Sequence, residues 1–345
     1  MMTIGGFRGM VFGVGLAAMS ALQGCALLKP VERLLPPPFP VGAAAAIPLG
    51  ETRASLQRIE RSEDLDRLLK SVFDRTLNEV DSSQLYTDRI SASLIDLTDA
   101  AHPRQGSFRG DVPWYPASVV KLPIMVYAMH MIQLEAVVYD AELRRQMREM
   151  IGPSSNTASQ YVVDRITFTT GGDELTGREW EEFRRARYLP YDYYTALDLD
   201  DIFPVQKTWD ELPTGRDRQL LGQPTDYHFE FSNKMTTDDT ARLLYLIDQR
   251  AIVSAGACDH MLELLERNPR PLDLEAGGAF FMTRGVPMDS RIWSKPGSTD
   301  LEWHDAAIIE LADGRRFVLV VFTHYRERPT AFLALFTRNL IESWR

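Results

Sequence analysis

A short apolar stretch with a serine and a lysine inside it reads YPASVVKLPIM over residues 115–125. Ser118 and Lys121 stand three residues apart, and on a helix residues i and i+3 lie on one face. The lysine amine can therefore reach the serine hydroxyl, and the surrounding apolar side chains are suited to bury the turn. Burial weakens the hold of an ammonium on its proton, so such a lysine can act as a base toward the serine. An isolated S-x-x-K is common in ordinary buried helices, so the rest of the chain must supply partners.

The remaining parts of an acyl-transfer site are supplied by four residues that lie later in the chain. Ser154 can relay a proton, and Asn156 can hydrogen-bond both a lysine and a substrate amide. Lys295, which we expect to open a turn at the end of a strand, adds a second positive charge that would hold a substrate carboxylate and lower the pKa of the first lysine. The backbone N–H groups of the serine nucleophile and of Ser298 would donate to the oxyanion.

Three short motifs in this order resemble those of the penicillin-recognising serine enzymes, in particular the class A β-lactamases. They are Ser118-x-x-Lys121, Ser154-x-Asn156 and Lys295-x-Gly297. The flanking Pro116-Ala117, Met150-Ile151, Thr157-Ala158 and Thr236-Thr237 also look like the surroundings of these motifs in the family. The resemblance covers about residues 90–345.

The resemblance implies both a fold and a set of roles. The fold would be α+β: an antiparallel sheet built from both chain ends and flanked by helices, with a helical subdomain that carries the S-x-x-K and S-x-N motifs. The implied catalytic residues are Ser118, Lys121 and Ser154, and the implied substrate-binding residues are Asn156, Lys295, Gly297 and Ser298. We expect a catalytic domain over residues 51–345 with a helical insert at about 118–290.

Two features depart from the family pattern. Pro296 replaces the usual Thr or Ser of the third motif and removes a hydroxyl and a backbone N–H, for which Ser298 or Thr299 are possible substitutes. The E-x-x-L-N motif, whose glutamate activates the deacylating water, is absent between Asn156 and Thr236. That interval instead holds many carboxylates that are open candidates for this base, including Glu174, Glu179, Glu182, Asp192, Asp198, Asp210 and Glu211.

The N-terminus has the pattern of an export signal. Arg8 precedes an apolar stretch over residues 10–22 that is short for a bilayer span, and LQGC at 22–25 resembles the lipobox of bacterial lipoproteins. We expect a signal peptide over 1–24, lipidation of Cys25 and a Pro- and Ala-rich tether over 25–50. The protein would then be exported and membrane-anchored, facing the periplasm or the outer membrane. The alternative is an ordinary signal peptide with an incidental cysteine.

Composition narrows the remaining possibilities. The chain has 345 residues, of which 45% are hydrophobic, so it can bury a large core. Its formal net charge of −10, without long basic runs, argues against a nucleic-acid partner. The six histidines show no metal-ligand spacing, so we expect neither a metal site nor another cofactor.

Apolar periodicity outlines the elements of the domain. Helices are predicted over 51–80 (with a break near Ser62 as an alternative), 118–134, 140–151, 237–248 and 329–345. Strands are predicted over 90–97, 291–294, 305–311 and 317–323. Residues 167–232 show no clear period and are predicted to be a long surface excursion.

Three functions fit these observations. The first is β-lactam hydrolysis through an acyl-enzyme on Ser118, as in β-lactamases that cause antibiotic resistance. The second keeps the acyl-enzyme and makes the substrate a cell-wall peptide or a small ester, as in D,D-peptidases, and the absent glutamate motif favours it. The third is a non-catalytic binding protein on the same fold, for which Pro296 argues.

Overall fold

The computed structural model describes residues 46–225, 228–271, 281–327 and 329–344, and in these residues the central element is a seven-stranded sheet. Its strand order is β1-β3-β2-β7-β6-β5-β4. The strands are β1 (Glu60–Arg61), β2 (Leu85–Asp96), β3 (Arg104–Phe108), β4 (Glu266–Arg267), β5 (Arg291–Ser298), β6 (Glu302–Glu310) and β7 (Arg316–Tyr325). All neighbours pair antiparallel except β1 and β3. The sheet is thus built from both ends of the described chain, which confirms the predicted fold class.

The joint between the two chain ends is the pairing of β2 with β7. Ile90 to Asp96 on β2 face Thr323 to Phe317 on β7 in continuous antiparallel register. Both strands are buried along this stretch, so side chains on each face contribute to a core. A sheet covered on both faces needs helices on both sides.

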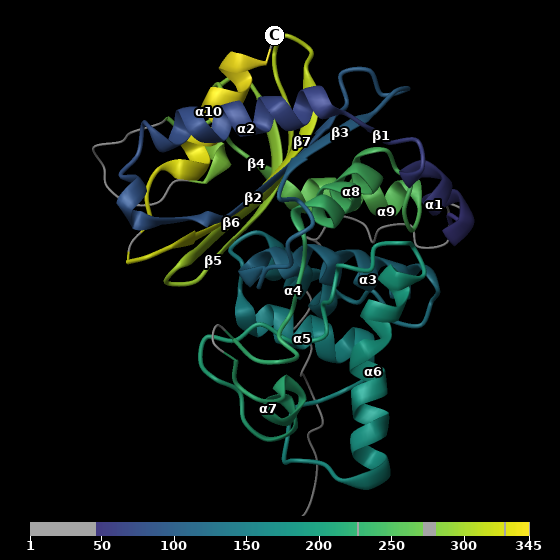
Figure 1. The fold of residues 1–345 in the computed structure, drawn as a ribbon. Coiled ribbons are helices and arrows are strands. Elements are labelled where there is room, and N and C mark those ends of the chain that lie inside the picture. The colour runs from purple at the N-terminus through teal and green to yellow at the C-terminus, as the bar shows by residue number, and fades with distance from the viewer. Residues whose placement is uncertain (1–45, 226–227, 272–280, 328, 345) are drawn as a thin grey trace, which may run out of the picture. The chain divides into compact units, whose positions relative to one another are not determined.

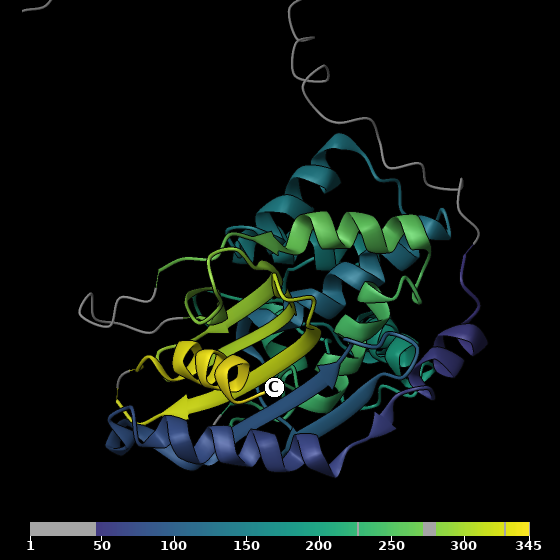
Figure 2. The same ribbon diagram turned by 90° about the horizontal axis from the view of Figure 1, so that it is seen from above.

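One face of the sheet is covered by α2 (Glu63–Leu77) and α10 (Phe332–Ser343), which lie side by side in Figure 2. Helix α2 begins at the N-cap Ser62, whose hydroxyl accepts from the Leu65 amide. It buries an apolar stripe that includes Leu65, Leu69 and Phe73. Each such side chain contributes about 1.5–3 kcal/mol when fully buried.

The other face is covered by the helices between β3 and β4, which continue into a helical region that carries the first two motifs (Figure 1). These are the 3₁₀ helix η3 (Ala117–Val120), α3 (Lys121–Gln133), α4 (Ala141–Ile151), α5 (Asn156–Thr167), α6 (Gly177–Thr195), α7 (Gly215–Leu221), α8 (Thr237–Asp248) and α9 (Ala255–Leu265). Helix α3 is buried nearly throughout, as its apolar sequence predicts. The remaining described elements are α1 (Leu49–Leu56) and the short 3₁₀ helices η2 (Ser82–Gln84) and η4 (Met282–Arg284).

Two sequence predictions need correction. The helix predicted over 51–80 is two helices, α1 (Leu49–Leu56) and α2, separated by strand β1, so the break near Ser62 is larger than expected. The stretch 167–232 is not simply an excursion without regular structure, because it contains the 19-residue helix α6 and the short helix α7. Helix α6 escaped prediction because Pro190 lies inside it and because a charged residue, Arg187, takes one of its buried positions.

The N-terminal predictions lie mostly outside the described residues. The signal peptide over 1–24 and the lipidation of Cys25 fall there entirely, as does most of the tether over 25–50. The packed chain extends somewhat N-terminal to residue 51, because the Ile47 amide donates to the Val253 carbonyl and α1 begins at Leu49. None of the helices in the described ranges combines the length and the apolar character that a bilayer span requires.

Candidate active site

Ser118 lies at a strained turn against the edge of the sheet. It is half-buried in η3, and the preceding Ala117 has a positive φ of 47°. Strand β5 passes so close that a Cβ on Gly297 would lie 2.7 Å from the backbone nitrogens of both Ser118 and Val119. A side chain at this position would push the strand away from the serine, which explains the glycine of the third motif.

Lys121 reaches Ser118 as the i, i+3 spacing predicts. Its Nζ lies 3.0 Å from Ser118 Oγ, 2.7 Å from Asn156 Oδ1, 2.5 Å from the Ser154 carbonyl and 3.2 Å from Ser154 Oγ. The side chain is fully buried, and this burial lowers the pKa of Lys121 to about 8, while the charge of Asp210 opposes the shift. Four oxygens surround an ammonium that has only three protons to donate, so one contact is left without a donor. Once the amine is neutral, its lone pair can accept the proton of a hydroxyl.

Lys295, on strand β5 of the sheet, contacts Ser154 from the other side. Its Nζ donates to Ser154 Oγ at 2.8 Å and to the Pro296 carbonyl at 2.6 Å. The pKa of Lys295 lies well below its ordinary value, first because the side chain is buried and second because Lys121 nearby is positively charged. Ser154 thus links the two lysines, and its positive φ of 66° shows that the backbone is held in an unusual conformation to do so.

Asn156 connects this cluster to a carboxylate from residues 167–232, the part of the helical region that is called the insert from here on. It is the first residue of α5, its Oδ1 accepts from Lys121, and its Nδ2 donates to Asp210 Oδ1 at 2.6 Å. Asp210 is one of the candidate carboxylates of the sequence, among which no choice was possible. The stretch Asp210-Glu211-Leu212-Pro213 is a shortened form of E-x-x-L-N with aspartate in place of glutamate. Its last position is Pro213 and not asparagine, and Asp217-Arg218-Gln219-Leu220 keeps the spacing from acid to leucine without a deletion. The pattern alone therefore does not select Asp210; its contact with Asn156 does.

The third motif lies within a strand and does not open a turn, so that expectation was wrong. Strand β5 continues to Ser298, with Lys295 opposite Ala306 and Gly297 opposite His304 on β6. On the other side of β5, β4 pairs only as far as Trp293. Pro296 therefore lies where that neighbour has ended, in the type of edge position that accepts proline.

The two residues considered as substitutes for the missing hydroxyl differ. The Thr299 hydroxyl donates to the Glu302 carboxylate and accepts from the Glu302 amide, so it is engaged in the turn between β5 and β6. Ser298 is exposed at the end of β5. Of the two, Ser298 is the hydroxyl better placed to meet a ligand.

His304 supports the nucleophile turn from beneath. Its Nδ1 accepts from the Thr323 amide at 3.1 Å, which leaves Nε2 to donate to the Tyr115 carbonyl at 3.0 Å. Burial lowers the pKa of His304 to about 4, so the ring is neutral. Its role is to fix the chain three residues before Ser118.

A cavity of about 260 Å³ lies between this turn and the insert. One part of its wall is aromatic or apolar, and the rest is polar and includes the Asp210 and Glu211 carboxylates, Lys207 and His228. The aromatic and apolar residues are Tyr115, Trp209, Leu212, Pro213, Leu221 and Phe229. Because Asp210 also contacts Asn156, the cavity adjoins the cluster around Lys121. It offers an apolar surface for a group attached to the acyl carbon of a substrate.

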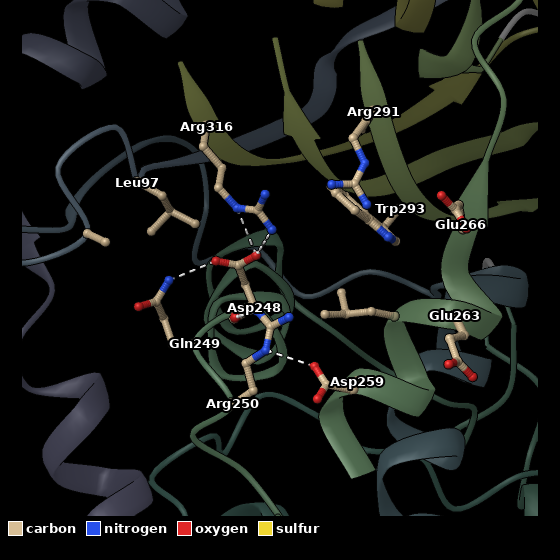
Figure 3. A pocket seen from close by; sticks show the side chains of 12 residues that line it. Leu97, Asp248, Gln249, Arg250, Asp259, Glu263, Glu266, Arg291, Trp293 and Arg316 are labelled. Atoms are coloured by element: carbon tan, nitrogen blue, oxygen red, sulfur yellow. Dashed lines mark hydrogen bonds and ion pairs between the residues drawn. The ribbon is translucent and has the colours of Figure 1, made fainter. Parts of the chain in front are cut away.

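A larger cavity, of about 650 Å³, lies elsewhere and is lined by none of the predicted site residues (Figure 3). Two of its three arginines are paired with acids that line it: Arg316 with Asp248, and Arg250 with Asp259 at 3.0 Å (Figure 3). The third, Arg291, lies over the Trp293 ring and 3.8 Å from Glu310. These charges already neutralise one another, so we do not assign chemistry to this cavity. Within the described parts of the chain, no group of three or more His, Cys, Asp or Glu is arranged to hold a metal ion.

Solved structures share this fold. The structure of PBP-A is 16% identical, with a TM-score of 0.54 over 83% of this chain and 97% of that chain. A β-lactamase from Sphaerobacter thermophilus DSM 20745 is 18% identical, with a TM-score of 0.52 over 79% and 95%. A β-lactamase from Chitinophaga pinensis DSM 2588 is 13% identical, with a TM-score of 0.56 over 80% and 97%. At these identities the likeness is one of fold.

Sequence comparison supplies the family. A search of curated proteins found no match. A family model described as "Beta-lactamase enzyme family" matches residues 131–343, a stretch that contains Ser154, Asn156 and Lys295 and begins after Ser118. The match covers more than half of the chain, and the fold of the solved neighbours agrees with it. The chain belongs to the β-lactamase enzyme family.

Proposed function

We propose that the protein is a serine hydrolase that opens β-lactams through an acyl-enzyme on Ser118. The observation that carries this proposal is the contact of 3.0 Å between Lys121 Nζ and Ser118 Oγ, within a cluster that Ser154 extends to Lys295. A buried amine with a pKa of about 8 is neutral in roughly one molecule in ten at pH 7. In that form it can accept the hydroxyl proton as the serine attacks.

The chemistry then divides into two steps. In acylation, Ser118 Oγ forms a bond to the lactam carbonyl carbon, the backbone N–H groups of Ser118 and Ser298 stabilise the oxyanion, and the C–N bond breaks. Ser154, between the two lysines, is placed to pass the proton to the leaving nitrogen. Lys295, with the exposed Ser298 hydroxyl, would hold the substrate carboxylate.

For deacylation we propose Asp210 as the base that takes a proton from water. Asn156 holds this carboxylate at 2.6 Å while its other amide atom contacts Lys121, so the carboxylate lies next to the acylation cluster. A water between Asp210 and the acyl carbon would add to the ester and release Ser118. The aromatic cavity beside Asp210 favours substrates with an apolar or aromatic acyl substituent.

The experiment compares the protein with Ser118→Ala, using a fluorescent penicillin and a chromogenic β-lactam. We expect covalent labelling and turnover in the native protein and neither in the variant. Ser71→Ala, an exposed serine on α2, is the matched control and should behave as native. Labelling that persists in Ser118→Ala would reject the nucleophile.

A second candidate function is a D,D-peptidase that acts on cell-wall peptides. The observation that favours it is the base itself, because aspartate is one methylene shorter than glutamate and is held by the Asn156 amide. The ratio of the two rates separates the candidates. Acylation followed by rapid release supports a β-lactamase, whereas an acyl-enzyme that persists for hours, together with release of a terminal D-alanine from a peptide, supports the peptidase.

The N-terminal predictions remain part of this proposal. We propose that Cys25 carries a lipid that anchors the catalytic domain to a membrane on the exported side. The lipobox-like LQGC at residues 22–25 supports it. Retention of the protein in the membrane fraction, and its release by Cys25→Ser, would test the anchor.

A further inference from the structure

The insert that carries Asp210 is built around a fully buried arginine. Arg187 lies in the middle of α6 with no exposed surface. Its Nε and Nη2 donate to the Val205 carbonyl at 3.1 and 2.9 Å, and its Nη1 donates to Asp217 Oδ1 at 2.8 Å. The guanidinium therefore fixes the backbone at Val205, five residues before Asp210.

Asp217 also links Arg187, through Lys207, to α5, the helix that begins at Asn156. Asp217, on α7, contacts Lys207 Nζ at 3.2 Å through its second oxygen, and Lys207 contacts Asp164 on α5 at 2.8 Å. Two cations and two anions are thus arranged in a continuous chain from α6 to α5. Asn156 at the start of α5 and Asp210 in the insert are both connected to this network.

Further hydrogen bonds fix the intervening segment. The backbone N–H of Gln206 donates to Asn233 Oδ1 at 2.8 Å, and Asn233 Nδ2 donates to the backbone carbonyl of Gln206 at 3.1 Å. Gln160 of α5 donates to the Thr208 carbonyl at 3.0 Å. The backbone is therefore held up to two residues before Asp210.

Stability alone does not account for such a network. Apolar side chains of similar volume commonly stabilise a protein as well as buried ion pairs do, because desolvation offsets the attraction between the charges. What a planar guanidinium adds is direction, since its fork of donors fixes the position of its acceptors. A fixed backbone is what a general base needs, because a displacement of about 1 Å can lower a rate by about 10²-fold.

We propose that Arg187 is a positioning residue for release of the acyl group. It acts through Val205 and the Asp217–Lys207–Asp164 chain to set the place of Asp210 relative to Asn156. The inference rests on the proposed function of Asp210 and extends it to a residue of α6 that touches neither Ser118 nor its partners.

The kinetic test measures acylation and deacylation separately in Arg187→Met. We expect deacylation to fall by about 10- to 100-fold, with acylation within about threefold of native, since the Lys121 cluster keeps its contacts. Arg184→Met is the matched control, because Arg184 is an exposed arginine of the same helix. Equal losses in both steps, or in the control, would overturn the proposal.

A double-variant cycle separates positioning from general damage. In an Asp210→Asn background the base is already absent, so adding Arg187→Met should slow deacylation by less than about threefold. A loss as large as that in the native background would show that Arg187 acts on something other than Asp210. Where Arg187→Met fails to fold, Arg187→Lys keeps the charge without the fork and should show a smaller loss confined to deacylation.

A readout that needs no substrate completes the test. Hydrogen exchange of the peptide over residues 203–213 should quicken in Arg187→Met, while exchange in α3 stays as in the native protein. If no variant or native protein is labelled at Ser118, the proposed function fails, and the exchange measurement still decides the positioning claim. Unchanged exchange over 203–213 would refute it.

Discussion

The two halves of the candidate site differ in how they are assembled. Ser118 and Lys121 meet through local backbone, whereas Ser154 contacts Lys121 and Lys295 across 33 and 141 residues of chain, with contacts of 2.8 to 3.2 Å between successive members. Each of the four residues nevertheless lies in a short sequence motif. Asp210 follows a segment, residues 205–208, that is held by contacts with α5, α6 and α7, and Asp210 itself contacts Asn156 of α5. The comparison teaches that the residues for acylation can be recognised by their motifs, whereas the carboxylate proposed for release of the acyl group lies in no such motif and is identified by its contact in the fold.

The largest expected effect is on the acylation half. Lys121→Met removes the base beside Ser118, and general-base catalysis contributes roughly 10²–10⁴-fold. We expect acylation by penicillin, followed in a stopped-flow experiment, to fall by about that factor. Lys70→Met, at an exposed lysine of α2, is the control and should leave the rate unchanged. A loss of less than tenfold would mean that another group accepts the proton.

The next effect belongs to the insert. Asp210→Asn keeps the size of the side chain and removes its basicity, so deacylation should fall by about 10²–10³-fold while acylation changes little. Mass spectrometry of the acylated protein over time measures this. Glu211→Gln, at the neighbouring carboxylate of the same cavity, should have at most a small effect. If Glu211→Gln gave the larger loss, the assignment of the base would move by one residue.

A smaller effect is expected from the contact between sheet and nucleophile turn. Gly297→Ala places a methyl group 2.7 Å from the Ser118 and Val119 nitrogens, so β5 must move away. We expect acylation to fall by about 10²-fold, with a normal circular dichroism spectrum. The control is Gly50→Ala on α1, where no atom lies within 4 Å of the added carbon. Native acylation in Gly297→Ala would show that this approach is not needed.

The last prediction needs no substitution and separates the two steps by pH. Lys121 serves as a base only when neutral, and burial lowers its pKa to about 8. Acylation should therefore rise about tenfold per pH unit below 8 and level off above it, with Lys295 and Asp210 as the nearest charges that shift this limb. Deacylation through the Asp210 carboxylate should not show the same limb. Acylation that is constant between pH 6 and 8 would contradict the role of Lys121.

The sequence was informative wherever local chemistry sets the structure. Helix α8 begins and ends where its Thr cap and apolar period predict, because Thr236 accepts from the Asp239 amide and the buried stripe is continuous. Helix α6 could not be predicted in this way. At Arg187 a charge occupies a buried position, and only its distant partners Val205 and Asp217 make that possible. The same long-range contacts decide which of many carboxylates meets Asn156.

The most direct test of the account is intact-protein mass spectrometry after mixing with penicillin, in native protein and in Asp210→Asn. We predict an adduct with the full mass of the ligand on the peptide that contains Ser118. It should be transient in the native protein and persistent in the variant. The absence of any adduct, or an equal lifetime in both proteins, would contradict the account.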